Sequence, residues 1–387
     1  MGARSSVKLA DTLNSTDNNF NLLRLSAATF VLIHHMHVFL GESGRVHWIV
    51  GEVLGSAVQI FIIISGFLVT KSWIKDPRPF TFVKKRVLRI FPALISTILL
   101  AVLIIGPLVT RADLELYFSH PGTTAYLKNI FLFPVYYFLP GVFMDNPYPH
   151  AVNGSLWTLP IEVFLYGVLI ILGLTRVMGR RVLVAVIAVM LIAGEQYFKP
   201  VLSTSRMFFL TMPVPFLLSL GIFFVLGALY YLYSEKIVLN KWMALLLIPL
   251  FVVSNKLPMS ELIRYAVLPY IVLYIAYTDI AFIKFFQKMD VSYGVYVYAF
   301  PIQQTVVHYL YGKIGTYTIL MLSMAIVLAV SYVSWRFVEK PSLAWAHKRP
   351  SGEGGRAPAD EKKDGALQDK ISRKSGKKRS KRKSGTS

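Results

Sequence analysis

The chain has 387 residues, of which 55% are hydrophobic and only 16% are charged, and its formal net charge is +21. Average soluble proteins are about 45–50% apolar and about 25% charged, so this composition favours a membrane protein. Many basic residues follow Trp335, which excludes a nucleic-acid-binding surface spread over a soluble fold. Cysteine is absent, which excludes disulfides, thiolate metal sites and an acyl-cysteine intermediate. We expect no metal and no nucleic-acid partner.

Long apolar blocks alternate with short polar segments through most of the chain. A transmembrane helix needs about 20 apolar residues to cross about 30 Å of hydrocarbon. We predict an all-α integral membrane protein with three parts, namely a cytoplasmic segment (1–19), a membrane domain (20–345) and a tail (346–387). Ten spans are predicted, the fifth and seventh of them short, at 20–40, 49–71, 88–110, 155–175, 182–195, 208–233, 242–255, 262–279, 291–311 and 314–335.

Loop charges predict the orientation, because Lys and Arg favour the cytoplasmic side. With the N-terminus inside, the inside segments before the tail carry sixteen of these residues and the outside segments carry eight. An even number of spans then places the C-terminus inside as well. The tail is rich in Lys, Arg, Ser and Gly, so we expect it to be disordered. It is expected to attract anionic lipid headgroups, or to serve only as a solvated topogenic segment.

The first predicted span carries Arg24 near its start and His35 near its other end. Ionisable residues in a span are costly and usually face a cavity or a partner. A spacing of eleven residues is three helical turns plus about 20°, so the two side chains share one face and lie about 16 Å apart. They are therefore expected to hold different parts of a long substrate. Alternatively, Arg24 snorkels to lipid headgroups and His35 lies at the far interface.

A basic stretch follows the second span and contains Lys84, Lys85, Arg86 and Arg89. Arg86 and Arg89 are three residues apart, so they share a helix face. Guanidinium groups bind phosphate in a bidentate manner, which suits the phosphates of coenzyme A. The alternative is that these charges serve only to keep the loop inside.

Polar residues also lie within later spans. Glu162 lies about two turns inside the fourth span, where we expect it to face an Arg or a His and to orient a catalytic His. A structural ion pair is the alternative. Ser65 and Gly66 are expected to serve helix packing. Pro301 frees a backbone carbonyl near Gln303, and such a kink is expected to line a cavity.

The segment from residue 111 to residue 155 is too apolar for a hydrated loop and too rich in Pro for a spanning helix. A partly buried, re-entrant or interfacial segment fits this pattern. It is expected to form a lid over an outward-facing site, or an aromatic belt at the headgroups.

In their order along the chain, these motifs resemble the bacterial acyltransferase family 3 over about residues 18–345. The family pattern of Arg, ten residues and His falls on Arg24 and His35. The other matches are Ser65-Gly-Phe67, Arg86 with Arg89 and Pro92, Trp157-Thr-Leu-Pro-Ile-Glu162, Ser292 with Tyr293 and Tyr296, and Glu339 with Pro341. One departure is Ala299, where many relatives carry His, so the role of that His is either absent or taken up elsewhere, with Gln303 and His308 as candidates.

The resemblance implies an O-acyltransferase of the bacterial inner membrane, in the form without a fused esterase-like domain. Acetyl-CoA, the implied donor, would be held by Lys84, Lys85, Arg86 and Arg89. Our hypothesis is that Arg24 stabilises the thioester or its developing oxyanion, that neutral His35 is the general base, and that Glu162 orients or electrostatically supports this step. The implied substrate-binding residues are Trp157, Ser292, Tyr293, Tyr296 and Gln303.

The implied acceptor is a hydroxyl of an extracytoplasmic or lipid-linked glycan, such as O-antigen or exopolysaccharide. Two other classes of function remain open from the sequence. A transporter or flippase of lipid-linked glycan would move its substrate without consuming an acyl donor. A structural subunit of an envelope assembly would tolerate substitution of Arg24 and His35.

Overall fold

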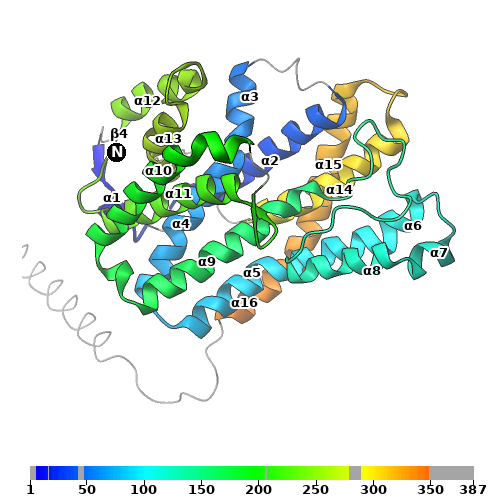
Figure 1. The fold of residues 1–387 in the computed structure, drawn as a ribbon, viewed down its shortest axis with the longest axis horizontal. Coiled ribbons are helices and arrows are strands. Elements are labelled where there is room, and N and C mark those ends of the chain that lie inside the picture. Colours follow the sequence, from blue (N-terminus) through cyan, green and yellow to red (C-terminus); the bar gives the residue numbers. More distant parts are fainter. Residues whose placement is uncertain (1–5, 16, 42–47, 205–206, 279–288, 348–387) are drawn as a thin grey trace, which may run out of the picture. The chain divides into compact units, whose positions relative to one another are not determined.

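The computed structural model describes the whole chain except residues 1–5, 16, 42–47, 205–206, 279–288 and 348–387. It divides into two compact units, Met1–Ala346 and His347–Ser387, and every side chain discussed below belongs to the first. Most of the predicted basic tail therefore lies outside the described residues. The first unit is built mainly from helices (Figure 1). The described helices are α1 (Leu9–Thr12), α2 (Phe20–Phe39), α3 (Trp48–Gly55), α4 (Ala57–Lys75), α5 (Pro79–Leu100), α6 (Gly106–Val109), α7 (Leu114–Ser119), α8 (Pro121–Leu127), α9 (Thr158–Leu174), α10 (Arg181–Thr204), α11 (Val214–Leu232), α12 (Lys241–Val253), α13 (Ser260–Tyr277), α14 (Ser292–Leu310), α15 (Thr316–Ser334) and α16 (Lys340–His347).

Short helical turns and strands complete the described fold. π-Helical turns join α5 to α6 (Ala101–Ile105) and α15 to α16 (Trp335–Glu339), and a 3₁₀ turn (Gly154–Trp157) precedes α9. Further 3₁₀ turns are Lys128–Phe131, Val177–Gly179 and Ser254–Lys256. Two antiparallel pairs of strands are present in the described residues, β1 (Ser6–Lys8) with β4 (Val238–Asn240) and β2 (Phe208–Phe209) with β3 (Met212–Pro213).

Among the described residues, seven helical stretches are long and apolar enough to cross a membrane. They are Phe20–Phe39, Trp48–Lys75, Pro79–Val109, Gly154–Leu174, Arg181–Leu202, Val214–Leu232 and Thr316–Trp345. The predicted all-α membrane architecture is thereby confirmed.

The other three predicted spans are also helical, as α12, α13 and α14. α12 has 13 residues, a length of about 20 Å, which is shorter than the hydrocarbon layer. α13 carries Glu261 and Arg264, and α14 carries Gln303, Gln304 and His308. The count of ten spans therefore stays a prediction.

Three predicted boundaries are wrong, each for a local reason. The fifth span is not short, because α10 continues for 24 residues through Pro200. α5 begins at Pro79, a residue preorganised for the first helical position, so the basic stretch that we placed in a loop is helical. α11 begins only at Val214, because residues 208–213 form the hairpin of β2 and β3.

Two glycines allow α4 and α11 to pack closely against each other. A Cβ atom on Gly66 of α4 would lie 2.1 Å from the carbonyl oxygen of Phe224 in α11, and one on Gly227 would lie 2.3 Å from the carbonyl oxygen of Ile63. The two backbones can approach this closely only because both residues lack a side chain. The predicted packing role of Gly66 is therefore confirmed.

Several segments predicted to be cytoplasmic meet at one end of the bundle. β1 near the N-terminus pairs with β4, which follows α11. The Asn19 side chain donates to two carbonyl oxygens at the end of α13, at 2.6 and 2.9 Å. Lys71, near the end of α4, donates to the carbonyl of Leu13. Segments that the Lys and Arg pattern assigns to the same side of the membrane therefore contact one another in the structure.

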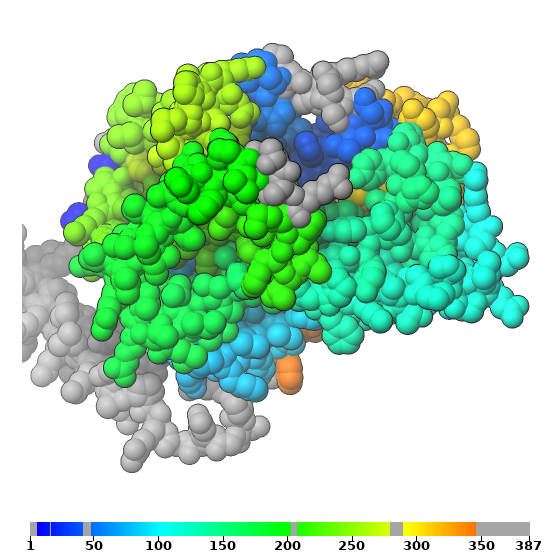
Figure 2. Space-filling view, viewed as in Figure 1, coloured from blue at the N-terminus to red at the C-terminus, as the bar shows by residue number. Residues whose placement is uncertain are grey.

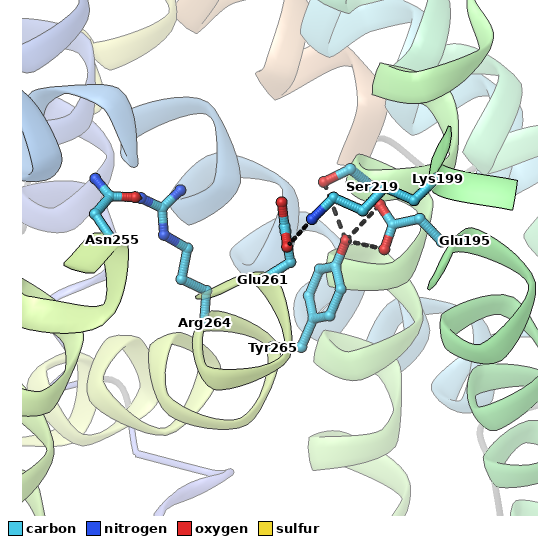
Figure 3. Close-up of polar contacts among 7 residues, drawn as sticks. All are labelled: Glu195, Lys199, Ser219, Asn255, Glu261, Arg264 and Tyr265. Carbon is cyan, nitrogen blue, oxygen red and sulfur yellow. Dashed lines mark hydrogen bonds and ion pairs between the residues drawn. The ribbon is translucent and has the colours of Figure 1, made fainter. Parts of the chain in front are cut away.

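A separate polar network lies toward the other end of α10 (Figure 3). The Tyr265 hydroxyl of α13 donates to the Glu195 carboxylate, 2.7 and 2.8 Å from its two oxygens. Lys199 pairs with Glu261 at 2.7 Å. Arg264 pairs with the buried carboxylate of Glu52 in α3. These contacts tie α3, α10 and α13 together.

Candidate active site

An ion-pair network joins the start of α2 and the start of α14 to α5. Arg24 Nη2 lies 3.2 Å from Asp290 Oδ2, and Arg89 Nη2 lies 2.8 Å from the same oxygen. The Ser292 hydroxyl donates to Asp290 Oδ1 at 2.7 Å. Arg24 also lies within electrostatic reach of Arg86. We call Arg24, Arg86, Arg89 and Asp290 the arginine cluster.

Asp290 is the member of this cluster that the sequence analysis missed. It lies just before α14, where a negative charge interacts favourably with the positive end of the helix dipole. Burial alone would raise the pKa of Asp290, but the charges of Arg24 and Arg89 and the Ser292 hydroxyl outweigh it and lower the pKa to about 2. The carboxylate is therefore ionised at neutral pH. A carboxylate two residues before the Ser-Tyr motif, at the predicted inner end of a span, was the available signal.

Arg86 has a different environment from Arg89. Its guanidinium carbon lies 5.8 Å from the ring centre of Phe82 and 5.9 Å from that of Tyr166. The Nε atoms of Arg86 and Arg24 are buried and have no hydrogen-bond partner within the described part of the chain. A buried donor without a partner is costly, so these two N–H groups point to an anionic or carbonyl ligand.

Lys84 and Lys85 do not join this cluster through their described contacts. Lys84 Nζ lies 4.4 Å above the ring of Trp345 in α16, which runs beside α5 (Figure 1). Lys85 Nζ lies 3.7 Å from an oxygen of Asp76. The structure thus brings Arg86 and Arg89 together with Arg24, and it places Lys84 and Lys85 against other partners. The role of these four basic side chains in holding the phosphates of coenzyme A stays a prediction.

His35 lies farther along α2, between two aromatic rings. Its imidazole stacks on Phe39 at 5.9 Å and meets Phe300 of α14 edge-on at 5.1 Å. Its Nδ1 atom is buried without a hydrogen-bond partner among the described residues. Arg24 reaches Asp290 just before α14, and His35 reaches Phe300 within it. Both side chains therefore lie toward α14, which agrees with the face that the eleven-residue spacing predicts.

Side chains of α14 hold the neighbouring elements in register. Gln303 Nε2 donates to the carbonyl of Leu32 at 2.8 Å, one turn before His35. The Tyr293 hydroxyl donates to a carbonyl of α5 at 2.9 Å, and the Tyr296 hydroxyl donates to the carbonyl of residue 155 at 2.9 Å. These three predicted substrate-binding residues thus make interhelical contacts. A direct role in substrate binding stays a prediction.

Trp157, the remaining predicted substrate-binding residue, lies at the end of the 3₁₀ turn before α9. Its ring packs 4.9 Å from the ring of Phe216 in α11. The residue is half-buried. Trp157 therefore lies at the junction of α9 and α11, and its role in substrate binding also stays a prediction.

Glu162 makes its contacts with Ser65 and Tyr166. The Ser65 hydroxyl donates to Glu162 Oε1 at 3.0 Å, and the Tyr166 hydroxyl donates to the same oxygen. Tyr166 carries Arg86 over its ring, so Glu162 is linked to the arginine cluster rather than to His35. The expectation that Ser65 serves packing alone is wrong, because it is a hydrogen-bond donor to this carboxylate.

Pro301 leaves one backbone carbonyl of α14 without a helical hydrogen bond, and side chains of other elements bond to it. A proline cannot bond to the carbonyl four residues earlier, which here belongs to Val297. That carbonyl accepts a hydrogen bond from Asn153 Nδ2 at 2.9 Å and one from the Thr97 hydroxyl at 3.3 Å. Val297 is fully buried. The freed carbonyl is therefore satisfied by side chains, and a cavity beside the kink stays a prediction.

The segment between α6 and α9 lies over the His35 end of α2. The Tyr148 ring lies 5.6 Å from Phe39 and 6.3 Å from Phe300, the two rings that flank His35. Asn146 Nδ2 donates to Gln304 Oε1 at 2.9 Å, so this segment is fastened to α14. We call residues 110–153, which connect α6 to the 3₁₀ turn before α9, the lid segment. Its role as a lid or as an aromatic belt stays a prediction.

His308 lies two turns beyond Phe300 on α14. Its Nδ1 atom is 3.1 Å from Asn146 Oδ1, so it belongs to the fastening of the lid segment. Eight residues of helix place His308 about 12 Å along α14 from Phe300, the ring that contacts His35. Its predicted role as a replacement for the missing His is not supported by these contacts.

The site thus lies in a helical bundle of the membrane-protein class, with the arginine cluster toward one end of α2 and the His35 imidazole farther along the same helix. A comparison with known families identifies the class more closely. The chain belongs to the acyltransferase family 3, whose "Acyltransferase domain" matches residues 17–336. The protein is therefore a multi-pass membrane acyltransferase, and the resemblance inferred from the motifs is confirmed.

Two curated proteins are similar over most of their length. The "O-acetyl transferase" of Shigella phage Sf6 is 31% identical over 333 residues, which are 84% of this chain and 96% of the phage protein. "Nodulation protein 10" of Rhizobium leguminosarum bv. viciae is 31% identical over 355 residues, which are 84% of this chain and 93% of that protein. No solved structure is significantly similar. Together with the family, these similarities identify the enzyme as an O-acetyltransferase.

Proposed function

We propose that the enzyme transfers an acetyl group from cytoplasmic acetyl-CoA to a hydroxyl of an extracytoplasmic glycan, such as O-antigen or exopolysaccharide. The observation that carries this proposal is that α2 directs Arg24 and His35 toward α14, with about 16 Å of helix between them. The ten predicted spans would place both termini in the cytoplasm of a bacterium, with the protein in its inner membrane. The basic tail would then lie against anionic lipids of the cytoplasmic leaflet.

The arginine cluster is the proposed donor-binding site. The Arg24 guanidinium lies in electrostatic reach of those of Arg86 and Arg89, and Asp290 pairs with Arg24 and Arg89 but not with Arg86. The unpartnered Nε–H groups of Arg24 and Arg86 suit phosphate oxygens, because bidentate guanidinium–phosphate bonds are charge-assisted. Arg24 would therefore bind the anionic part of the donor, rather than stabilise the thioester as first expected.

His35 is the proposed general base. In the transfer, the imidazole takes the proton from the acceptor hydroxyl and the hydroxyl oxygen attacks the thioester carbonyl. The carbon–sulfur bond then breaks, and the thiolate of coenzyme A leaves and takes up a proton. The long pantetheine arm would bridge the distance from the arginine cluster to His35. Phe39 and Phe300 would keep bulk water from the imidazole, which disfavours hydrolysis of the thioester.

Release of thiol tests this proposal. Purified enzyme would be incubated with acetyl-CoA and with deacetylated envelope polysaccharide from a host that lacks the enzyme. Thiol should appear only when both are present, and mass spectrometry should find acetyl groups on the polysaccharide. Family membership favours this reaction over the transporter alternative. Movement of lipid-linked glycan without thiol release would refute the proposal.

A further inference from the structure

A surface pocket lies between the lid segment and the β2–β3 hairpin. It has a volume of about 400 Å³ and is lined by Pro134, Val135, Tyr137, Phe208, Thr211 and Pro213. In Figure 2 the bright-green surface of the hairpin lies beside the blue-green surface of the lid segment near the centre of the view. A volume of this size is typical of small-molecule sites, so the pocket can hold part of a ligand.

One wall of the pocket is connected to His35. Residues 137–138 pair with residues 151–152 through the Phe138–Ala151 bridge and a 2.8 Å hydrogen bond to the carbonyl of residue 137. Residue 151 belongs to a buried cluster with Phe39 and Phe300. These are the rings that hold the imidazole of His35. The wall of the pocket is therefore connected through one pair of backbone segments to the two rings that pack against His35.

The opposite wall is connected to α9. The Phe209 ring of the hairpin lies 5.6 Å from Phe164, two residues after Glu162. Leu210 and Thr211, at the turn of the hairpin, have φ angles of 47° and 70°. Positive φ is unfavourable for a β-branched residue such as Thr211, and strain of this kind clusters at ligand sites. The hairpin thus places a strained residue on the rim of the pocket.

We propose that this pocket is the acceptor subsite of the enzyme and that it binds a pyranose ring of the glycan. The proposal rests on the proposed function. The Phe208 ring is 62% exposed and offers a face for the C–H groups of a sugar. The hydroxyls of Tyr137 and Thr211 can hydrogen-bond to sugar hydroxyls. The Tyr137 phenol also lies within electrostatic reach of Tyr296 in α14, so the pocket adjoins the interior of the bundle.

Kinetics with two substrates test the proposal. The probe is deacetylated envelope polysaccharide from a host that lacks the enzyme, with acetyl-CoA as the second substrate. Phe208→Ala is expected to raise the KM for polysaccharide at least fivefold and to leave the KM for acetyl-CoA unchanged. Tyr137→Phe, which removes only the hydroxyl, should give a smaller change in the same direction. Phe118→Ala is the matched control, because Phe118 is 48% exposed and does not line the pocket.

Three results would overturn this inference. The first is a polysaccharide KM for Phe208→Ala equal to that of Phe118→Ala. The second is an equal rise of both KM values, which would indicate a structural defect. The third is capture of a bilayer acyl chain in the pocket with no effect on the polysaccharide KM. Failure of the wild-type enzyme to release thiol from acetyl-CoA would instead refute the proposed function.

Discussion

Substitution of Arg86 by Lys separates charge from geometry at the proposed donor site. Lysine keeps the positive charge but lacks the planar fork and the Nε–H group. Arg86 lies over the rings of Phe82 and Tyr166, and its Nε atom has no partner among the described residues. Loss of the Nε–H group in Arg86→Lys should therefore lower the affinity for acetyl-CoA much more than it lowers the stability of the protein.

The size of the effect follows from the contacts that change. A hydrogen bond to a charged group contributes about 1.5–3 kcal/mol, which corresponds to about a 10- to 150-fold change in a dissociation constant. Because the lysine side chain of the Arg86→Lys variant would retain the Coulomb attraction to phosphate, the lower end applies, and we expect the Kd for acetyl-CoA to rise about tenfold. The cation–π contacts contribute about 0.5–1 kcal/mol each and remain possible for lysine, so the melting temperature should change little.

The assay is equilibrium binding of radiolabelled acetyl-CoA to enzyme in lipid nanodiscs. Arg336→Lys is the matched control, since the Arg336 guanidinium also lies over an aromatic ring, 5.7 Å from that of Phe337. The control should bind acetyl-CoA like wild type. The reasoning is refuted if Arg86→Lys binds as tightly as the control, or if both variants lose affinity equally.

Three further predictions concern catalysis, charge and packing. His35→Ala should abolish acetylation of the polysaccharide, detected by mass spectrometry, with an unchanged Kd for acetyl-CoA; retained activity, or a similar loss in the exposed neighbour variant His34→Ala, would contradict this. Asp290→Asn should lower the melting temperature, because it removes the carboxylate that forms ion pairs with both Arg24 and Arg89. Since the pKa of Asp290 in the folded protein is about 2, this difference from wild type should be full above about pH 4 and shrink as the pH falls toward 2; a difference that grew at low pH would be inconsistent. Gly66→Ala should destabilise by at least about 1–3 kcal/mol in a thermal melt, whereas Gly167→Ala, whose Cβ meets no atom within 4 Å, should not; equal melting temperatures would argue against the close α4–α11 packing.

The helices were predictable because a membrane imposes one strong rule. Apolar runs of sufficient length form helices, since the backbone must satisfy its hydrogen bonds internally. The shared face of Arg24 and His35 followed from helical periodicity alone. The boundaries were less predictable. The basic residues 84–89 read as a loop, but a helix that starts with Pro79 carries them.

Polar partners in the site depended on tertiary contacts. Asp290 lies 201 residues from Arg89 in the sequence, and no local pattern indicates that the two pair. Glu162 was expected to meet a His or an Arg, whereas its contacts are two hydroxyl groups on α4 and α9. Lys85 pairs instead with Asp76, a half-buried carboxylate nine residues earlier in the chain. Spacing predicts which side chains share a face, but it does not predict which element covers that face.

The acceptor pocket shows the same limit. Its two walls come from residues 134–137 and 208–213, which are about seventy residues apart in the sequence. The second wall was predicted as part of a spanning helix. A hairpin forms there instead, and its strained turn has none of the Gly or Asn residues that usually mark such a turn. The composition of residues 208–213 therefore gave no indication of a hairpin.

Transfer across a sealed bilayer tests the central claim most directly. Enzyme would be reconstituted in one orientation in proteoliposomes, with labelled acetyl-CoA on the side of the arginine cluster and deacetylated polysaccharide on the opposite side. We predict label on the polysaccharide in this arrangement, and none when the two substrates exchange sides. Labelling only when both substrates share one side would contradict transfer from the arginine cluster to His35 across the membrane.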